Sequence, residues 1–152
     1  MVNRGITFIE LLIVAAIIGI VALIVLPAFS SIKEKQVLNN GVENVISALN
    51  KARGETLSSL DSSSYGVYFS SGEIVIFKGT IYSSADPDNE IISITSPASI
   101  SNVTLGGQSG GAGEMYFNRL TGSPSKSGTI TISSPSYSKI ITLSATGAVS
   151  KN

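Results

Sequence analysis

A single carboxylate lies near the start of the most apolar stretch of the sequence. Glu10 follows residues 6–9 and precedes an uncharged run over residues 11–29. An ionised carboxylate in hydrocarbon is costly unless it is paired with a cation. Residues 11–32 contain no Lys or Arg, and the nearby cations of the same chain are Arg4 and an amino terminus. The chemistry open to Glu10 is therefore charge pairing, and a group from another chain is a candidate partner.

The residue types on which most catalytic and metal sites depend are missing. The 152-residue sequence contains no His and no Cys. It therefore has no Cys/His zinc site, no thiol nucleophile, no disulfide and no His base to activate one of its many Ser residues. Lys plus Arg and Asp plus Glu both total 10, so no overall basic field favours nucleic acid. We expect a protein that is not an enzyme and needs no cofactor.

The elements that must position Glu10 begin with a short leader. Residues 1–5 are polar and carry one positive charge, Arg4. The run over residues 11–29 would span about 29 Å as a helix, which matches the hydrocarbon core of a bilayer. Arg4 favours a cytoplasmic N-terminus, although two lysines beyond the run weaken this bias. We predict a transmembrane helix over residues 6–29, with its N-terminus in the cytoplasm and the remaining chain outside.

The helical pattern continues beyond the apolar run. Apolar residues recur at mostly helical spacing with charged residues between them, which predicts an amphipathic continuation over residues 30–60. Gly19 and Pro27 are expected to weaken the helix, because Gly has low helix propensity and Pro removes a backbone hydrogen bond. The segment beginning at Asp61 ends the pattern. The apolar positions of the continuation are Ile32, Val42, Val45, Ile46, Leu49 and Leu57.

Residues 61–152 have the pattern of a β-rich globular domain. Short segments of period-two character alternate with Ser- and Gly-rich turns, and residues 70–73 are expected to close a hairpin. Ile130 and Ile132 should share one face of their strand. Residues 106–113 and 121–128 are predicted loops. The predicted strands are residues 65–69, 74–82, 91–95, 101–105, 115–120, 129–133 and 137–144.

One polar cluster has a spacing that suits a hard cation. Asp86, Asp88, Asn89 and Glu90 place four oxygen-bearing side chains within five residues. Calcium is bound by oxygen ligands of this kind. The same composition is typical of a solvated turn built around Pro87, and we favour that interpretation. No metal ligand is therefore assigned.

The segment Gly5-Ile6-Thr7-Phe8-Ile9-Glu10 resembles the type III signal of the type IV pilin superfamily. That signal has a short basic leader ending in Gly, then a hydrophobic helix whose fifth residue is Glu. The resemblance implies cleavage between Gly5 and Ile6 by prepilin peptidase and N-methylation of Ile6. It also implies pairing of Glu10 with the terminal amine of a neighbouring subunit, and Gly19 and Pro27 match the family's helix-weakening positions. Ile6 departs from the usual Phe or Met at the new N-terminus.

The remainder of the chain resembles the GspH/FimT-type minor pilins and pseudopilins. Residues 65–82 look like the first β-hairpin of that family, and residues 140–150 look like its closing strands. Some FimT-like pilins bind DNA through basic C-terminal residues. Here Ala148 stands where family members often carry a basic residue, and only Lys139 and Lys151 lie near the end. Because phosphate binding needs several clustered cations, nucleic acid is not an expected partner.

These observations predict an α+β fold in which a long N-terminal helix packs its outer half on an antiparallel β-sheet domain. The first hypothesis is a minor pseudopilin of a type II secretion pseudopilus, with other pilin or pseudopilin subunits, prepilin peptidase and the membrane as partners. The second is a minor pilin of a type IV pilus, in adhesion, motility or DNA uptake. The third is a secreted binding domain with an ordinary signal peptide cleaved after Ser30. A plain transmembrane anchor is a further alternative.

Cleavage between Gly5 and Ile6 is the first testable prediction. Intact-mass analysis of the membrane form should show the loss of five residues and the gain of one methyl group, because the leader ends at Gly5. The control is the same protein made in cells without prepilin peptidase, which should keep its full mass. Cleavage after Ser30 would contradict the pilin interpretation.

Overall fold

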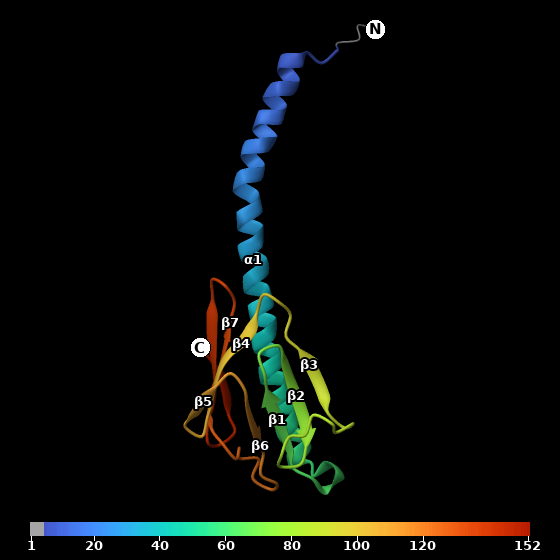
Figure 1. Ribbon diagram of the computed structural model, residues 1–152, viewed down its shortest axis with the longest axis vertical. Helices are drawn as coiled ribbons and strands as arrows, with labels where there is room; N and C mark the ends of the chain where they lie inside the picture. The colour runs from blue at the N-terminus through green and yellow to red at the C-terminus, as the bar shows by residue number, and fades with distance from the viewer. Residues whose placement is uncertain (1–4) are drawn as a thin grey trace. The chain divides into compact units, whose positions relative to one another are not determined.

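A computed structural model describes residues 5–152, apart from the side chains of residues 26–28. The described chain forms one long α-helix, one short 3-10 helix and a series of short strands (Figure 1). In chain order, the elements are α1 (Phe8–Leu57), η1 (Leu60–Ser62), β1 (Tyr65–Phe69), β2 (Glu73–Lys78), β3 (Glu90–Ser93), β4 (Ser99–Leu105), β5 (Gln108–Gly110), β6 (Gly113–Tyr116), β7 (Gly128–Ser133), β8 (Ser138–Leu143) and β9 (Val149–Lys151).

The chain divides into two compact units, with the division inside α1 after Glu34. In the first unit, the apolar side chains described along the helix are exposed almost all round, for example Ile18 at 64% and Leu23 at 77%. This segment is the one helix among the described residues that is long and apolar enough to cross a membrane. Its apolar surface needs lipid or other protein to cover it.

The second unit, residues 35–152, contains the outer half of α1 and two antiparallel sheets. One sheet has the strand order β3-β2-β1-β6, and the other has the order β5-β4-β7-β8-β9. The hairpin predicted around residues 70–73 is present, since Phe69 pairs with Ile74 across it. The predicted α+β class is confirmed, although the sequence did not indicate that the strands form two sheets.

One continuous apolar core holds this unit together. It is built from a stripe on the outer half of α1 and from the inward-facing side chains of both sheets. Ile130 and Ile132 both point into it from β7, as their spacing predicts. With no disulfide available, burial of this apolar area is the dominant stabilising contribution. The helix contributes Leu38, Val42, Val45, Ala48, Leu49 and Ala52.

Two polar side chains attach the end of α1 to the β-structure. The buried Thr56 hydroxyl donates to the Ala52 carbonyl at 2.8 Å and accepts from the Tyr65 amide at 2.9 Å. Arg53 donates from Nε to the Gly122 carbonyl at 3.0 Å and from Nη2 to the Thr146 carbonyl at 3.1 Å. The last turns of the helix are thereby bonded to β1 and to two loops that flank the second sheet.

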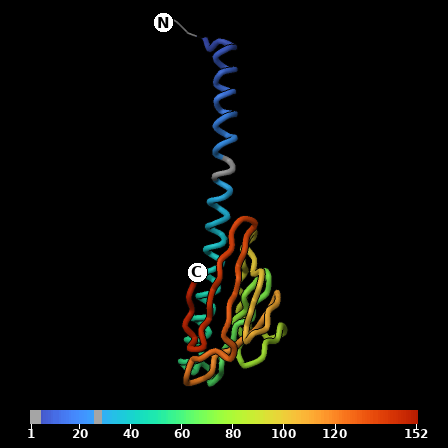
Figure 2. The backbone as a smooth tube through the Cα atoms, turned by 90° about the vertical axis from the view of Figure 1, so that its left-hand side faces the viewer, coloured from blue at the N-terminus to red at the C-terminus, as the bar shows by residue number. Residues whose placement is uncertain are grey.

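Ion pairs on the surface add further links between the helix and the strands. Lys51 pairs with Glu90, and Lys151 pairs with Glu43 of α1. Figure 2 shows the C-terminal strand, which carries Lys151, lying beside the helix. A third pair joins Lys78 of β2 to Asp61 of η1.

The hydrogen bond from Lys78, at 3.0 Å, lowers the pKa of the Asp61 carboxyl below its usual 3.8. Because the pKa of Asp61 is lower in the folded state, the contribution of this interaction to the free energy of unfolding is fully present above the unfolded pKa. It is lost as the pH falls through the folded pKa.

Three of the expected segments differ most from the structure. Residues 74–82 were expected as one strand, but β2 ends at Lys78 because Gly79 adopts a positive φ of 107°. The strand expected over 115–120 ends at Tyr116, and Leu120 has a φ of 72°. The loop expected over 106–113 contains β5, because Gly106 and Gly107 form a tight turn with positive φ that returns the chain alongside β4.

Truncating Leu49 tests whether the helical stripe holds the second unit together. In a fragment starting at Ser30, which we expect to fold alone, Leu49→Ala should lower the free energy of unfolding by about 2–5 kcal/mol. The reason is that Leu49 is fully buried, whereas Leu57 on the same helix is 47% exposed. Leu57→Ala is the matched control and should cost much less. Equal losses in urea denaturation would contradict the assigned core.

Candidate assembly site

The residues singled out for assembly lie at the start of the first unit. Gly5, Ile6 and Thr7 precede α1 and are exposed, so the Gly5–Ile6 peptide bond lies outside regular secondary structure. Such a segment is open to a peptidase in a way that a helix is not. Arg4, the basic residue of the predicted leader, lies outside the described residues.

Glu10 lies in the first turn of α1, where it takes part in a reciprocal pair of hydrogen bonds. The Glu10 amide donates to Thr7 Oγ1 at 3.3 Å, and the Thr7 amide donates to Glu10 Oε2 at 3.5 Å. This is a capping box, in which Thr7 and Glu10 each satisfy a backbone N–H that the helix leaves free. A carboxylate at this position also interacts favourably with the positive end of the helix dipole.

The capping role of Thr7 and Glu10 was missed from the sequence. The signal was present, because a Thr followed three residues later by Glu and then by an apolar run is a typical helix start. Within its own chain, Glu10 therefore has the Thr7 amide as a partner. The cap also fixes where the helix begins and which way the carboxylate is directed.

Glu10 shares a helix face with apolar side chains. Ile6, Glu10, Leu11 and Val14 line a shallow depression of about 210 Å³ on the first unit. The carboxylate is exposed at the edge of this surface. A partner that covers the apolar side chains would bring a cation close to a carboxylate in a medium of low dielectric constant, where charge pairing is strong.

The two expected helix-weakening residues lie within α1, which is assigned as helix across both of them. A Cβ at Gly19 would meet no atom within 4 Å, so neighbouring side chains do not explain this glycine. The Pro27 side chain lies outside the described residues. Neither residue lies near Glu10, since Gly19 is nine positions further along the helix, a rise of about 13.5 Å, and Pro27 is further still.

The acidic segment 86–90 has the geometry of a turn. The Asp88 amide donates to Asp86 Oδ1 at 3.0 Å, and Asn89 Nδ2 donates to the Ser83 carbonyl at 2.7 Å. Glu90 is engaged with Lys51. Within the part of the chain that the structure describes, no group of three or more acidic side chains is placed to hold a metal ion.

Comparison with known families identifies both parts of the chain. A model described as type II transport protein GspH matches residues 41–147, which include the outer part of α1 and eight of the strands. The chain belongs to the GspH family. A second model, the prokaryotic N-terminal methylation motif, matches residues 1–26 and thus the segment around Glu10. The resemblance inferred from residues 5–10, 65–82 and 140–150 is confirmed. Searches of curated proteins and of solved structures give no match.

Removing the Thr7 hydroxyl tests the cap. In detergent micelles, Thr7→Val should speed hydrogen exchange of the Glu10 amide about fivefold, because losing a helix cap costs about 1 kcal/mol. Glu10→Gln is the control, since Gln also serves in a capping box and leaves the Thr7 acceptor in place. Unchanged exchange in Thr7→Val would show that this hydroxyl does not cap α1.

Proposed function

We propose that this GspH-family chain is a minor pseudopilin, a structural subunit that is processed by prepilin peptidase and built into the pseudopilus of a type II secretion system. The observation that carries the proposal is the coincidence of two matches on one chain. The GspH model covers the β-structure, and the methylation motif covers the apolar start of α1. A filament subunit needs both parts. The apolar helix holds it in the membrane before assembly, and the β-structure forms the part outside the membrane.

The proposed topology places α1 across the inner membrane as a single-pass anchor, with its N-terminus in the cytoplasm. Support comes from the exposed apolar surface of the first unit, which has no covering element among the described residues. The second unit would then lie outside the cytoplasm. Its chain has no cysteine for a disulfide, so apolar burial is the dominant contribution to its stability there.

We further propose that Glu10 selects the position of the subunit in the fibre. The capping box accounts for one oxygen of the carboxylate, Oε2, and the side chain remains exposed to a neighbour. The terminal amine of Ile6 in an adjacent subunit, once methylated and freed by cleavage, is a cation of suitable size. A buried charge that meets its partner in only one alignment contributes specificity rather than net stability.

Three substitutions separate charge pairing from helix capping. Glu10→Ala removes both functions and should reduce incorporation about tenfold, which corresponds to the loss of a charge-assisted hydrogen bond of about 1.4 kcal/mol. Glu10→Gln keeps the cap but removes the charge, so it should be milder than Ala and still impaired. Thr7→Val weakens the cap but keeps the charge and should assemble almost normally. Incorporation is measured by cross-linking to other fibre subunits at equal membrane abundance.

Equal incorporation of wild type, Glu10→Gln and Glu10→Ala would show that Glu10 does not guide assembly. A subunit at the extreme tip has no neighbour above it, so locating the subunit in the fibre by gold labelling completes the experiment. Loss of incorporation in Thr7→Val equal to that in Glu10→Ala would assign the effect to the cap instead of the charge.

A further inference from the structure

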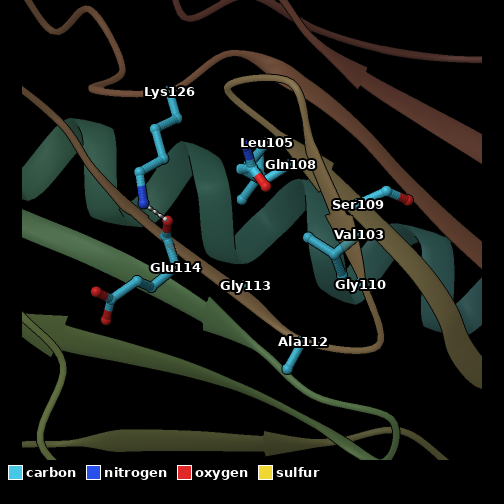
Figure 3. Close-up of a pocket in the computed structure, with 9 residues that line it drawn as sticks. All are labelled: Val103, Leu105, Gln108, Ser109, Gly110, Ala112, Gly113, Glu114 and Lys126. Carbon is cyan, nitrogen blue, oxygen red and sulfur yellow. Dashed lines mark hydrogen bonds between the residues drawn. The ribbon is translucent and has the colours of Figure 1, made fainter.

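A groove lies where the chain passes from one sheet to the other. β4 belongs to the second sheet, β5 forms its edge, and two residues later the chain enters β6, the edge of the first sheet. The β4–β5 hairpin, the start of β6 and Lys126 enclose a groove of about 280 Å³ (Figure 3). Two sheet edges therefore border the same groove.

The main chain of β5 presents hydrogen-bonding groups on its outer side. Leu105 and Gln108 flank the two-residue turn, so they form a hydrogen-bonded pair, and the next pair along, Thr104 and Ser109, is of the non-hydrogen-bonded kind. The amide and carbonyl of Ser109 consequently point away from β4. The Ser109 side chain is engaged separately, since its hydroxyl donates to Asn102 Oδ1 at 2.9 Å.

On the opposite border of the groove, the main-chain groups of Glu114 also point away from the neighbouring strand. The Phe117 amide donates to the Tyr65 carbonyl at 2.9 Å, which makes Tyr116 and Glu114 the residues whose main-chain groups point away from β1. Tyr116 is satisfied there, because the Ser125 amide donates to its carbonyl at 2.7 Å. The Glu114 carbonyl accepts only a long bond of 3.4 Å from Lys126 Nζ (Figure 3).

The floor of the groove is apolar and close-packed. Val103 and Leu105 from β4 form it. A Cβ at Gly113 would lie 2.8 Å from Val103 Cγ1, so only glycine lets β6 approach β4 this closely. Both floor side chains belong to the core and are almost fully buried, Val103 at 1% and Leu105 at 4% exposure, so a bound side chain would contact only their outer edges.

One cation, the ammonium of Lys126, lies at the border of the groove. The aliphatic stem of Lys126 passes over the hairpin turn, 3.4 Å from where a Cβ of Gly106 would be. Among the residues that the structure describes, Lys126 forms no salt bridge. The Glu114 carboxylate points away from Lys126 (Figure 3). It accepts a hydrogen bond from the Tyr82 amide at 3.1 Å. The ammonium is thus available to an incoming anion.

We propose that this groove binds an extended segment of a protein partner, which adds as a strand to the outer edge of β5. The bound segment pairs its main chain with Ser109, places an apolar side chain over Val103 and Leu105, and directs an Asp or Glu side chain to Lys126. Strand addition supplies affinity through main-chain hydrogen bonds, and the apolar floor and the cation supply selectivity. The open edge and the positive charge without an acidic partner are the features that match such a segment, and the nearly buried floor adds a small apolar contact.

Binding of short synthetic peptides to the full-length protein in detergent micelles tests the proposal. The probes are fluorescein-labelled peptides of about six residues that alternate Thr with Val or Leu, with a single Asp moved stepwise along the sequence. Fluorescence anisotropy should show saturable binding for one Asp position. Lys126→Glu should weaken that binding about tenfold or more, and replacing the peptide Asp by Lys should restore it to this variant.

Lys139→Glu is the matched control, because it makes the same charge change on β8, outside the residues that line the groove, and should leave affinity unchanged. N-methylation of the peptide amide that faces Ser109 should abolish binding while leaving the protein intact.

The proposal is overturned if no peptide binds below ~1 mM, if both lysine variants weaken binding equally, or if N-methylation has no effect. It is also overturned if the protein dimerises through the groove, seen as a dimer in ultracentrifugation that Lys126→Glu abolishes. The assay uses protein outside any fibre, so its failure leaves the pseudopilin proposal standing.

Discussion

The folded unit depends on one stripe of apolar side chains along the outer half of α1. Both sheets place their inner faces against the same core, to which the helix contributes residues from Leu38 to Ala52. Neither a disulfide nor a second α-helix is available among the described elements to replace that contact. Ala48 and Ala52 are fully buried, and their small side chains let backbones approach closely. The hydrogen bonds of Thr56 and Arg53 then fix the helix end to β1 and to two loops.

The first half of α1 has no such contact with the β-structure among the described residues. Its apolar side chains have no covering element within the described chain, so its stability as a helix comes from backbone hydrogen bonds and from the environment around it. In hydrocarbon, free backbone groups at a helix start are costly, and the Thr7–Glu10 cap satisfies two of them. The residue that the pilin resemblance assigns to assembly thus also has a local structural role, and an explanation of its variants has to separate the two.

Division of the strands into two sheets creates features that a single sheet would not have. The crossing from β5 to β6 brings two edges together, and edges are where backbone groups remain open to another chain. Gly113 permits the close approach of β6 to β4. The Gly106–Gly107 turn sets the register that directs the main-chain groups of Ser109 away from β4. A filament subunit with such an edge has a means of contacting extended partners that is independent of its membrane helix.

Much of this protein follows from the sequence, because its strongest signals are local. The length of the apolar run, the position of Glu10 and the helical spacing of Val42, Val45 and Leu49 predict a long helix with two different surroundings. Strict alternation at Ile130 and Ile132 predicts their burial. The pilin resemblance rests on residues 5–10, and the GspH resemblance rests on residues 65–82 and 140–150. The Thr7–Glu10 cap was also readable, since a capping box needs only two residue types at fixed spacing.

Only the tertiary structure decided how the strands are distributed and where edges meet. Pairing between β4 and β7 or between β1 and β6 joins residues far apart in sequence, and no local pattern encodes such contacts. The Gly-rich segment 106–113 looked like a loop because its composition has no alternating apolar residues, yet two positive-φ glycines close a hairpin there. Lys126 gains its significance from neighbours on β4, β5 and β6, so its place beside an open edge appears only once both sheets have formed.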